Sequence, residues 1–191
     1  NVKNLTRFVK SFMDHMGYEK AFLVGNSLGG HIALMMQKLY PNNVHGLILA
    51  GSSGLYESAM GNSYPRRGDR DYIAERIKDV FYVKEVATEE LIDEVFATVN
   101  DRNKAIKTLA ISKSAIRHNM SNDIKEFDVP TCIVWGRQDD VTPPEVADKF
   151  KDLMPNSELH WIDECGHAAM MERPEEFNTI IQKWLDKLLS N

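Results

Sequence analysis

Cysteine is scarce in this sequence: only Cys132 and Cys165 occur among 191 residues. Two cysteines are too few for a disulfide framework, so we expect reduced thiols in a reducing compartment and favour a cytoplasmic location. Cys132 lies in an apolar run and is interpreted as a small core residue. The sequence begins at Asn1 rather than at a methionine, so a signal peptide would not be visible in it.

Long apolar runs and an excess of basic charge are also missing. No apolar run approaches the length of a membrane span, so we expect no membrane-crossing segment. The 23 basic and 28 acidic side chains give a net charge of −5, which argues against a nucleic-acid partner. The histidines form no metal-ligand spacing with a cysteine or with one another, so we expect no metal. The hydrophobic fraction of 43% is ordinary for a globular protein.

The apolar pattern alternates between short continuous runs and longer helical stripes. Strands are predicted over 21–24, 44–50, 131–135 and 159–162, and helices over 1–16, 27–40, 144–154 and 174–189. Strands that are apolar on both faces and joined by helices indicate a parallel sheet covered on both sides. The run 159–162 is less uniformly apolar, so we expect it near an edge of the sheet.

The alternation stops over residues 52–126, which contain no strand-like run. Amphipathic helices are predicted there, near 69–82, 88–99 and 101–118. We therefore expect an α/β core made of residues 1–51 and 127–191, interrupted by a helical lid. A loop from Gly61 to Gly68 contains the pair Arg66-Arg67. We interpret this pair as solvated, with recognition of a substrate carboxylate as the alternative.

The stretch Gly25-Asn26-Ser27-Leu28-Gly29 joins the first predicted strand to a helix. This context makes the G-x-S-x-G pattern a candidate nucleophile elbow, with Ser27 on a strained turn. We expect glycine to be required at both ends of the motif, because side chains there would collide. The turn also places the Leu28 backbone N–H at a helix N-terminus, where it can stabilise an oxyanion.

A serine nucleophile needs a base, and the base needs a carboxylate to orient it. In parallel sheets such groups lie on loops at the carboxyl ends of strands. The loop after strand 131–135 contains Asp139 and Asp140, and the loop after strand 159–162 contains His167. Both aspartates are candidates: Asp139 follows the strand glycine by three residues, whereas Asp140 is placed for capping or for solvent. Glu57 is a poorer candidate on distance.

The other polar groups near these loops have simpler interpretations. Cys165 would lie close to the site but has no visible base of its own. We interpret the remaining histidines, which fall on predicted helices and strands, as structural: His15, His31, His45, His118 and His160.

Three segments together resemble the α/β-hydrolase fold family: GNSLGG at 25–30, WGRQDDVTPP at 135–144 and ECGHAAMMERPEEF at 164–177. The resemblance implies Ser27 as nucleophile, Asp139 as orienting acid and His167 as base. It also implies that the inserted segment is a cap that shapes the substrate pocket, and that no cofactor is needed. A serine at the nucleophile position argues against the dehalogenase and epoxide-hydrolase branches, which use aspartate there.

Within that family, Asn26 followed by Ser27 and a double glycine is similar to carbon–carbon bond hydrolases of aromatic ring-cleavage pathways. We take Asn26 as a candidate substrate-binding residue. Those enzymes often have an aromatic residue directly after the histidine, where this chain has Ala168. We therefore expect hydrolysis of a small carboxylic ester, with hydrolysis of a ring-cleavage dienone as an alternative. A ligand-binding receptor on the same fold is a third possibility.

The resemblance further implies that the family's first strands lie before Asn1. The loop that supplies a second oxyanion N–H in the family would lie there too. Strand 21–24 would then have an unpaired edge. We expect an N-terminal segment or a second chain to complete the sheet, beside a small-molecule substrate as the other partner.

Overall fold

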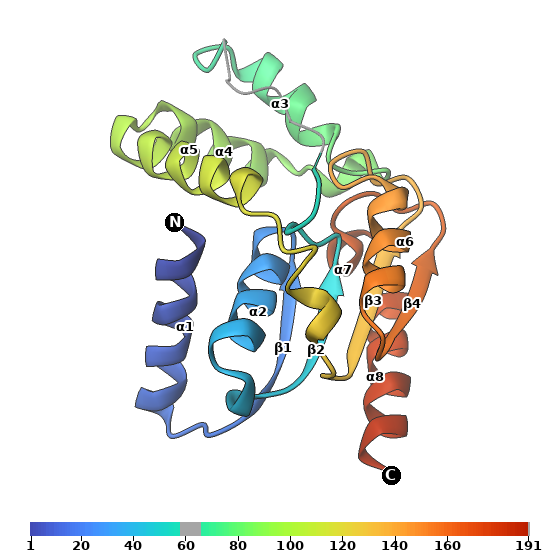
Figure 1. Ribbon diagram of the computed structural model, residues 1–191. Helices are drawn as coiled ribbons and strands as arrows, with labels where there is room; N and C mark the ends of the chain where they lie inside the picture. The colour runs from blue at the N-terminus through green and yellow to red at the C-terminus, as the bar shows by residue number, and fades with distance from the viewer. Residues whose placement is uncertain (58–65, 191) are drawn as a thin grey trace.

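The computed structural model describes residues 1–57 and 66–190. Its centre is a parallel sheet in the spatial order β1-β2-β3-β4 (Figure 1). The strands are β1 (Ala21–Asn26), β2 (Val44–Ala50), β3 (Thr131–Gly136) and β4 (Ser157–Ile162). The last residues of β1 and β2 pair with each other (Asn26 with Ala50), as do those of β3 and β4 (Gly136 with Ile162), and Ala50 pairs with Val134, two residues before the end of β3. The loops that follow the strands therefore all begin at the same end of the sheet, where the strands have their carboxyl ends. The predicted parallel sheet is confirmed, and β4 lies at one edge of the described strands, as expected.

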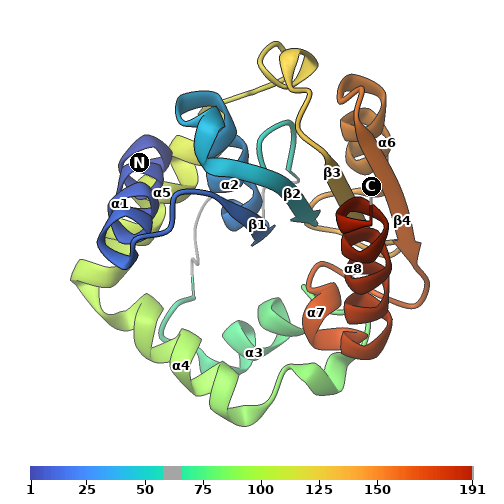
Figure 2. The same cartoon turned by 90° about the horizontal axis from the view of Figure 1, so that it is seen from below.

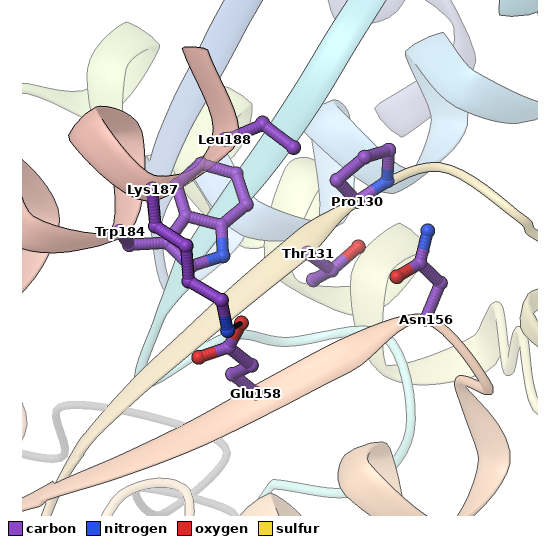
Figure 3. A pocket seen from close by; sticks show the side chains of 7 residues that line it. All are labelled: Pro130, Thr131, Asn156, Glu158, Trp184, Lys187 and Leu188. Carbon is purple, nitrogen blue, oxygen red and sulfur yellow. Dashed lines mark hydrogen bonds and ion pairs between the residues drawn. The ribbon is translucent and has the colours of Figure 1, made fainter. Parts of the chain in front are cut away.

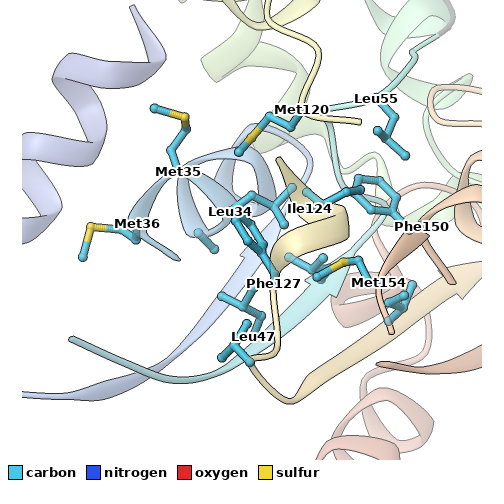
Figure 4. Packing of buried hydrophobic residues seen from close by; sticks show 14 of the residues in the cluster. Leu34, Met35, Met36, Leu47, Leu55, Met120, Ile124, Phe127, Phe150 and Met154 are labelled. Carbon is cyan, nitrogen blue, oxygen red and sulfur yellow. The ribbon is translucent and has the colours of Figure 1, made fainter. Parts of the chain in front are cut away.

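Helices cover both faces of the sheet (Figure 2). On one face lie α1 (Val2–Met16), α2 (Leu28–Leu39) and α6 (Pro144–Leu153), and on the other lie α7 (Ala169–Glu172) and α8 (Pro174–Leu189). Alternate residues of the strands point to opposite faces. Leu47 and Leu49 therefore join the core under α2, whereas Ile48 and Ala50 join the core under α8. Figure 4 shows the first of these cores.

Local signals set the ends of several helices. The Asn1 side chain accepts a hydrogen bond from Asn4 N at the start of α1, and Gly17 ends that helix in the left-handed conformation (φ 74°). Pro144 and Pro174 occupy the first turns of α6 and α8. A fixed φ and a missing N–H suit proline to that position.

The apolar stripe predicted for α1 is only partly buried. The face that packs on α2 carries Val2, Thr6 and Met13. Phe8 and Phe12 lie on another face and are 71% and 53% exposed. The apolar pattern therefore predicts the helix correctly, but it does not identify which of the apolar residues are buried against α2.

The segment between β2 and β3 holds α3 (Arg70–Lys78), α4 (Glu89–Asn100) and α5 (Arg102–Arg117), which we call the cap helices. They lie beyond the carboxyl ends of the strands (Figure 1). The first was predicted to run to residue 82 but ends at Lys78. Two residues after this helix, Val80 O accepts a hydrogen bond from His167 N (3.0 Å).

Short 3₁₀ turns complete the described elements: η1 (Pro41–Asn43), η2 (Lys84–Val86) and η3 (Ile124–Glu126). The two connections between the cap helices and the sheet lie side by side, because Met120 N donates to Gly54 O (2.8 Å) and Asn119 Nδ2 donates to Leu55 O (2.9 Å).

The loop expected from Gly61 to Gly68 is described only in part, because 61–65 lie outside the described residues. Arg66 and Arg67 are exposed. The Arg66 guanidinium lies 5.7 Å from the centre of the Tyr72 ring.

Candidate active site

Ser27 is the single residue between the end of β1 at Asn26 and the start of α2 at Leu28. Its backbone is in a sparsely populated region (φ 51°, ψ −118°), where a non-glycine residue is strained by about 1–3 kcal/mol. Backbone hydrogen bonds hold the turn in place: Ser27 N donates to Ala50 O, and Ser53 N donates to Ser27 O, both at 3.0 Å. The predicted strand–turn–helix context of the G-x-S-x-G motif is confirmed.

The glycines of this turn are not equally constrained. A Cβ at Gly25 would lie 2.3 Å from the carbonyl carbon of Gly29, and a Cβ at Gly30 would lie 2.2 Å from Ser52 Oγ. At Gly29 itself, a Cβ would meet nothing within 4 Å beyond its own helix. The expectation of a steric need for glycine is therefore confirmed at Gly25 and wrong at Gly29, because the crowding is one-sided.

Leu28 is the first residue of α2. The N–H groups of a helix's first turn have no partner within the helix and carry the positive end of its dipole. The Leu28 N–H, directly after Ser27, therefore has the position expected of an oxyanion donor.

Asp139 is buried in the loop after β3 and accepts hydrogen bonds on both carboxylate oxygens. Its Oδ1 accepts from Val141 N and Thr142 N, both at 2.9 Å. Its Oδ2 accepts from Thr142 Oγ1 (2.8 Å) and lies 2.9 Å from His167 Nδ1. Asp140, the other candidate, is exposed. Of the two aspartates, Asp139 is the one that contacts the imidazole.

The loops that carry these two side chains are fastened to each other. We call residues 137–143 the acid loop and residues 163–168 the histidine loop. Gln138 N donates to Cys165 O (2.9 Å), and Gln138 Oε1 accepts from Cys165 N (3.1 Å). Trp135 Nε1 donates to Thr142 O (2.8 Å), which ties the acid loop back to β3. The pairing of Asp139 with His167 is thus supported by backbone contacts on both sides.

Asn26 connects the Ser27 turn to the histidine loop. Its side-chain nitrogen donates to Ala50 O and to His167 O, both at 3.0 Å. Both amide hydrogens are therefore directed at backbone carbonyls, and Oδ1 is the group left for a substrate. Substrate binding by Asn26 stays a prediction.

The end of β2 lies beside both the Ser27 turn and the His167 imidazole. Gly51 follows β2 with φ 47°, and a Cβ there would lie 3.0 Å from His167 Nδ1. Ser27 N donates a hydrogen bond to the carbonyl oxygen of Ala50, the residue before Gly51. The hydrogen bonds of the described residues do not include one between Ser27 Oγ and His167, a contact that is often long without substrate.

The sequence model of the alpha/beta hydrolase family matches residues 2–180, nearly the whole chain. The chain belongs to the alpha/beta hydrolase family. Its membership confirms the resemblance based on the three motif segments.

Relatives of this alpha/beta hydrolase include named enzymes. A 2-hydroxy-6-oxononadienedioate/2-hydroxy-6-oxononatrienedioate hydrolase of Comamonas testosteroni is 30% identical over 193 residues, covering 94% of this chain and 67% of that protein. The chain spans about two thirds of the length of the curated relatives it matches.

Solved structures agree with this assignment. An alpha/beta hydrolase enzyme from a sediment metagenome of the Mar Chica lagoon, Morocco, is 47% identical with a TM-score of 0.76 (97% of this chain, 70% of that one). A serine hydrolase involved in carbazole degradation is 28% identical with a TM-score of 0.81 (97% and 71%).

Cys165 lies in the histidine loop of this alpha/beta hydrolase and is fully buried. Burial, and secondarily the nearby Glu172 carboxylate, raises the pKa of its thiol to about 12. A thiol with that pKa is protonated near neutral pH and is a weak nucleophile. Burial likewise raises the pKa of Cys132 to about 12, in keeping with its predicted place in the core.

Glu172 is a buried carboxylate that the sequence analysis did not single out. It accepts hydrogen bonds from backbone N–H groups of the histidine loop and of the segment after α3. Acidic residues are common near the start of a helix, and Glu172 lies two residues before Pro174, which begins α8. Nothing in the local sequence therefore indicated that this carboxylate is buried. Only the fold brings these distant segments together.

A cavity of about 210 Å³ lies at the opposite end of the sheet (Figure 3). It is lined by the first residues of β3 and β4 and by the end of α8: Pro130, Thr131, Asn156, Glu158, Trp184, Lys187 and Leu188. The candidate residues follow the carboxyl ends of the strands, so this cavity is not part of the candidate site.

The part of the chain that the structure describes contains no group of three or more His, Cys, Asp or Glu side chains able to hold a metal ion. None of its helices has both the length and the apolar character needed to cross a membrane.

Proposed function

We propose that this protein is a serine hydrolase that cleaves a small carboxylic ester through an acyl-enzyme formed on Ser27. The observation that carries the proposal is the contact between His167 Nδ1 and buried Asp139 Oδ2, at the sheet edge where the strained Ser27 turn lies. An imidazole held in this way presents its other nitrogen as a base. Membership in the alpha/beta hydrolase family supports the same chemistry.

The proposed reaction has two halves. His167 Nε2 takes the Ser27 hydroxyl proton, Ser27 Oγ attacks the substrate carbonyl carbon, and the Leu28 N–H donates to the oxyanion. The bond to the leaving alkoxide breaks as His167 returns the proton to it. Water then attacks the acyl-enzyme with His167 again as base, which releases the acid and regenerates Ser27.

A second candidate is hydrolysis of the carbon–carbon bond of a ring-cleavage dienone. It is favoured by the curated relatives, several of which are named as hydrolases of such compounds. Asn26 beside Ser27 agrees with that candidate, and Ala168 after the histidine departs from it.

Completion of the sheet by an N-terminal segment or a second chain is part of the proposal. Among the described strands, β1 pairs only with β2, and Val24 on it is 60% exposed. Phe8 and Phe12 of α1 add exposed aromatic surface. A second oxyanion N–H would come from the completing segment. Loss of one such donor typically costs about 3 kcal/mol of transition-state stabilisation.

The test combines active-site labelling with turnover. We expect a fluorophosphonate to label one serine stoichiometrically, and labelling to disappear in Ser27→Ala but not in Ser112→Ala, which changes an exposed serine of α5. A panel of p-nitrophenyl esters of increasing acyl length, with one ring-fission dienone, then identifies the substrate class. Labelling without turnover of any member would favour the ligand-binding receptor. Absence of both in a folded protein would overturn the proposal.

A further inference from the structure

Glu172 is the last residue of α7 and is 7% exposed. Its two carboxylate oxygens serve different parts of the molecule. Oε2 accepts from Tyr82 N (2.7 Å) and Val83 N (3.0 Å), in the segment after α3. Oε1 accepts from Gly166 N (3.0 Å) and Ala168 N (3.4 Å), the residues on either side of His167. One side chain therefore joins residues 79–83, which we call the cap segment, to the histidine loop.

Direct contacts bring the same two segments together. His167 N donates to Val80 O (3.0 Å). A Cβ at Gly166 would lie 2.8 Å from both Val80 O and Tyr82 N, so the two backbones are in close contact. Ala168 is buried in the small apolar cluster of the cap helices, with Phe81. The position of the His167 backbone is thus determined jointly with the cap segment.

A buried carboxylate that accepts backbone N–H groups is often a purely structural device. The choice of partners distinguishes Glu172 from that general case. Its loop-side donors flank the residue whose imidazole contacts Asp139, and its cap-side donors belong to the segment that contacts His167 N. Displacing either side would move the imidazole relative to Asp139.

We propose that Glu172 is a positioning residue that fixes the histidine loop against the cap segment and thereby holds the His167 imidazole on Asp139. The importance of this position for catalysis rests on the proposed function of His167 as a base. The positioning itself is a property of the fold and can be measured without turnover.

Substitution by glutamine breaks the arrangement on one side only. A carboxamide has one acceptor oxygen and one NH₂ donor, so one of the two N–H pairs would face a donor. Glu172→Asp keeps the charge and both acceptors on a shorter side chain. Glu176→Gln makes the same chemical change at an exposed position of α8 and is the matched control.

The primary measurement is the His167 Nδ1–H resonance, observed by histidine-selective NMR on the intact chain, with His167→Gln for assignment. In Glu172→Gln we expect this resonance to move upfield, because the contact between Nδ1 and Asp139 Oδ2, 2.9 Å in the structure, becomes longer. We also expect at least tenfold faster solvent exchange of the Nδ1 proton. Glu176→Gln should match the unmodified protein, and Glu172→Asp should lie closer to it than Glu172→Gln.

Thermal unfolding separates positioning from stability. An identical His167 Nδ1–H resonance and exchange rate in Glu172→Gln and Glu176→Gln, with a lower melting temperature only in the former, would overturn the proposal. Should Glu172→Gln fail to fold, the same comparison made with Glu172→Asp decides: an unchanged Nδ1–H resonance overturns the proposal, and an upfield shift with faster exchange supports it. A protein that hydrolyses no ester yet shows these Nδ1–H changes overturns only the proposed function. Where turnover is present, we expect kcat to fall about tenfold or more with KM little changed.

Discussion

His31 Nε2 and His118 Nδ1 lie 2.8 Å apart, with their rings stacked at a centroid distance of 5.1 Å. His31 belongs to α2 and is fully buried, whereas His118 directly follows α5. One ring must donate and the other accept, so the contact requires that at least one of the two be neutral. The pair joins a core helix to the end of a cap helix, which makes this junction sensitive to protonation.

Stability should therefore fall in mild acid. Burial, and secondarily the charge of His118, lowers the pKa of His31 from 6.5 to about 4. Between these values the unfolded chain binds a proton that the folded protein does not, so the contribution of His31 is complete above pH 6.5 and is lost as pH falls toward 4. The full loss is on the order of 3 kcal/mol. Urea unfolding at pH 7 and pH 5 should show about 2 kcal/mol of this loss, because pH 5 lies only part of the way between the two pKa values.

The control compares two histidine replacements. His31→Asn should lower stability at pH 7 but flatten its dependence on pH, because the asparagine takes up no proton. His15→Asn, at an exposed position of α1, should leave the dependence unchanged. Equal slopes in both variants and in the unmodified protein would show that His31 does not have the lowered pKa.

Gly25 and Gly29 should respond oppositely to alanine. Gly25→Ala places a methyl group against the Gly29 backbone, so we expect a loss of about 2–3 kcal/mol of unfolding free energy. Gly29→Ala adds a methyl in open space within α2, and we expect stability to be unchanged or to rise by up to about 1 kcal/mol. Chemical unfolding of the two variants provides the test. Comparable losses would contradict the one-sided crowding.

Asp139→Asn should abolish most activity while leaving the protein folded. An amide at this position no longer stabilises the imidazolium or fixes the required tautomer, so we expect Ser27 labelling and ester turnover to slow by about 10⁴-fold. Asp140→Asn changes the exposed neighbour and should have little effect on either rate. A large loss in the Asp140 variant with a small one in the Asp139 variant would reverse the assignment of the acid.

Thr142 should matter through its hydroxyl rather than its shape. Thr142→Val removes the O–H that donates to Asp139 Oδ2 at 2.8 Å, and we expect it to lower the unfolding free energy by about 1–3 kcal/mol. Thr142→Ser keeps the hydroxyl and should retain most of that stability. Equal losses in the two variants, measured by urea unfolding, would show that the methyl group and not the hydrogen bond accounts for the effect.

Much of the core could be predicted from local pattern. The runs 44–50 and 131–135 correspond closely to β2 and β3, because strands buried on both faces must be continuously apolar. The G-x-S-x-G turn could also be predicted from the sequence. The backbone strain at Ser27 and the close approach of Gly25 to the Gly29 backbone both arise from residues within a few positions of each other. The three cap helices were also predicted, but the end of α3 at Lys78 was not, and the residues after it contact His167, which is distant along the chain.

Sequence pattern thus predicts the strand–turn–helix elbow and the parallel sheet, and the family resemblance selects Asp139 as the acid. The fold adds the contact between Asp139 and His167, the hydrogen bond from Asn26 to His167 O, and the exposure of Phe8 and Phe12. The reason is separation along the chain. Pattern reflects neighbours within one element, whereas Asn26 and His167 are 141 residues apart and meet only when the strand ends align.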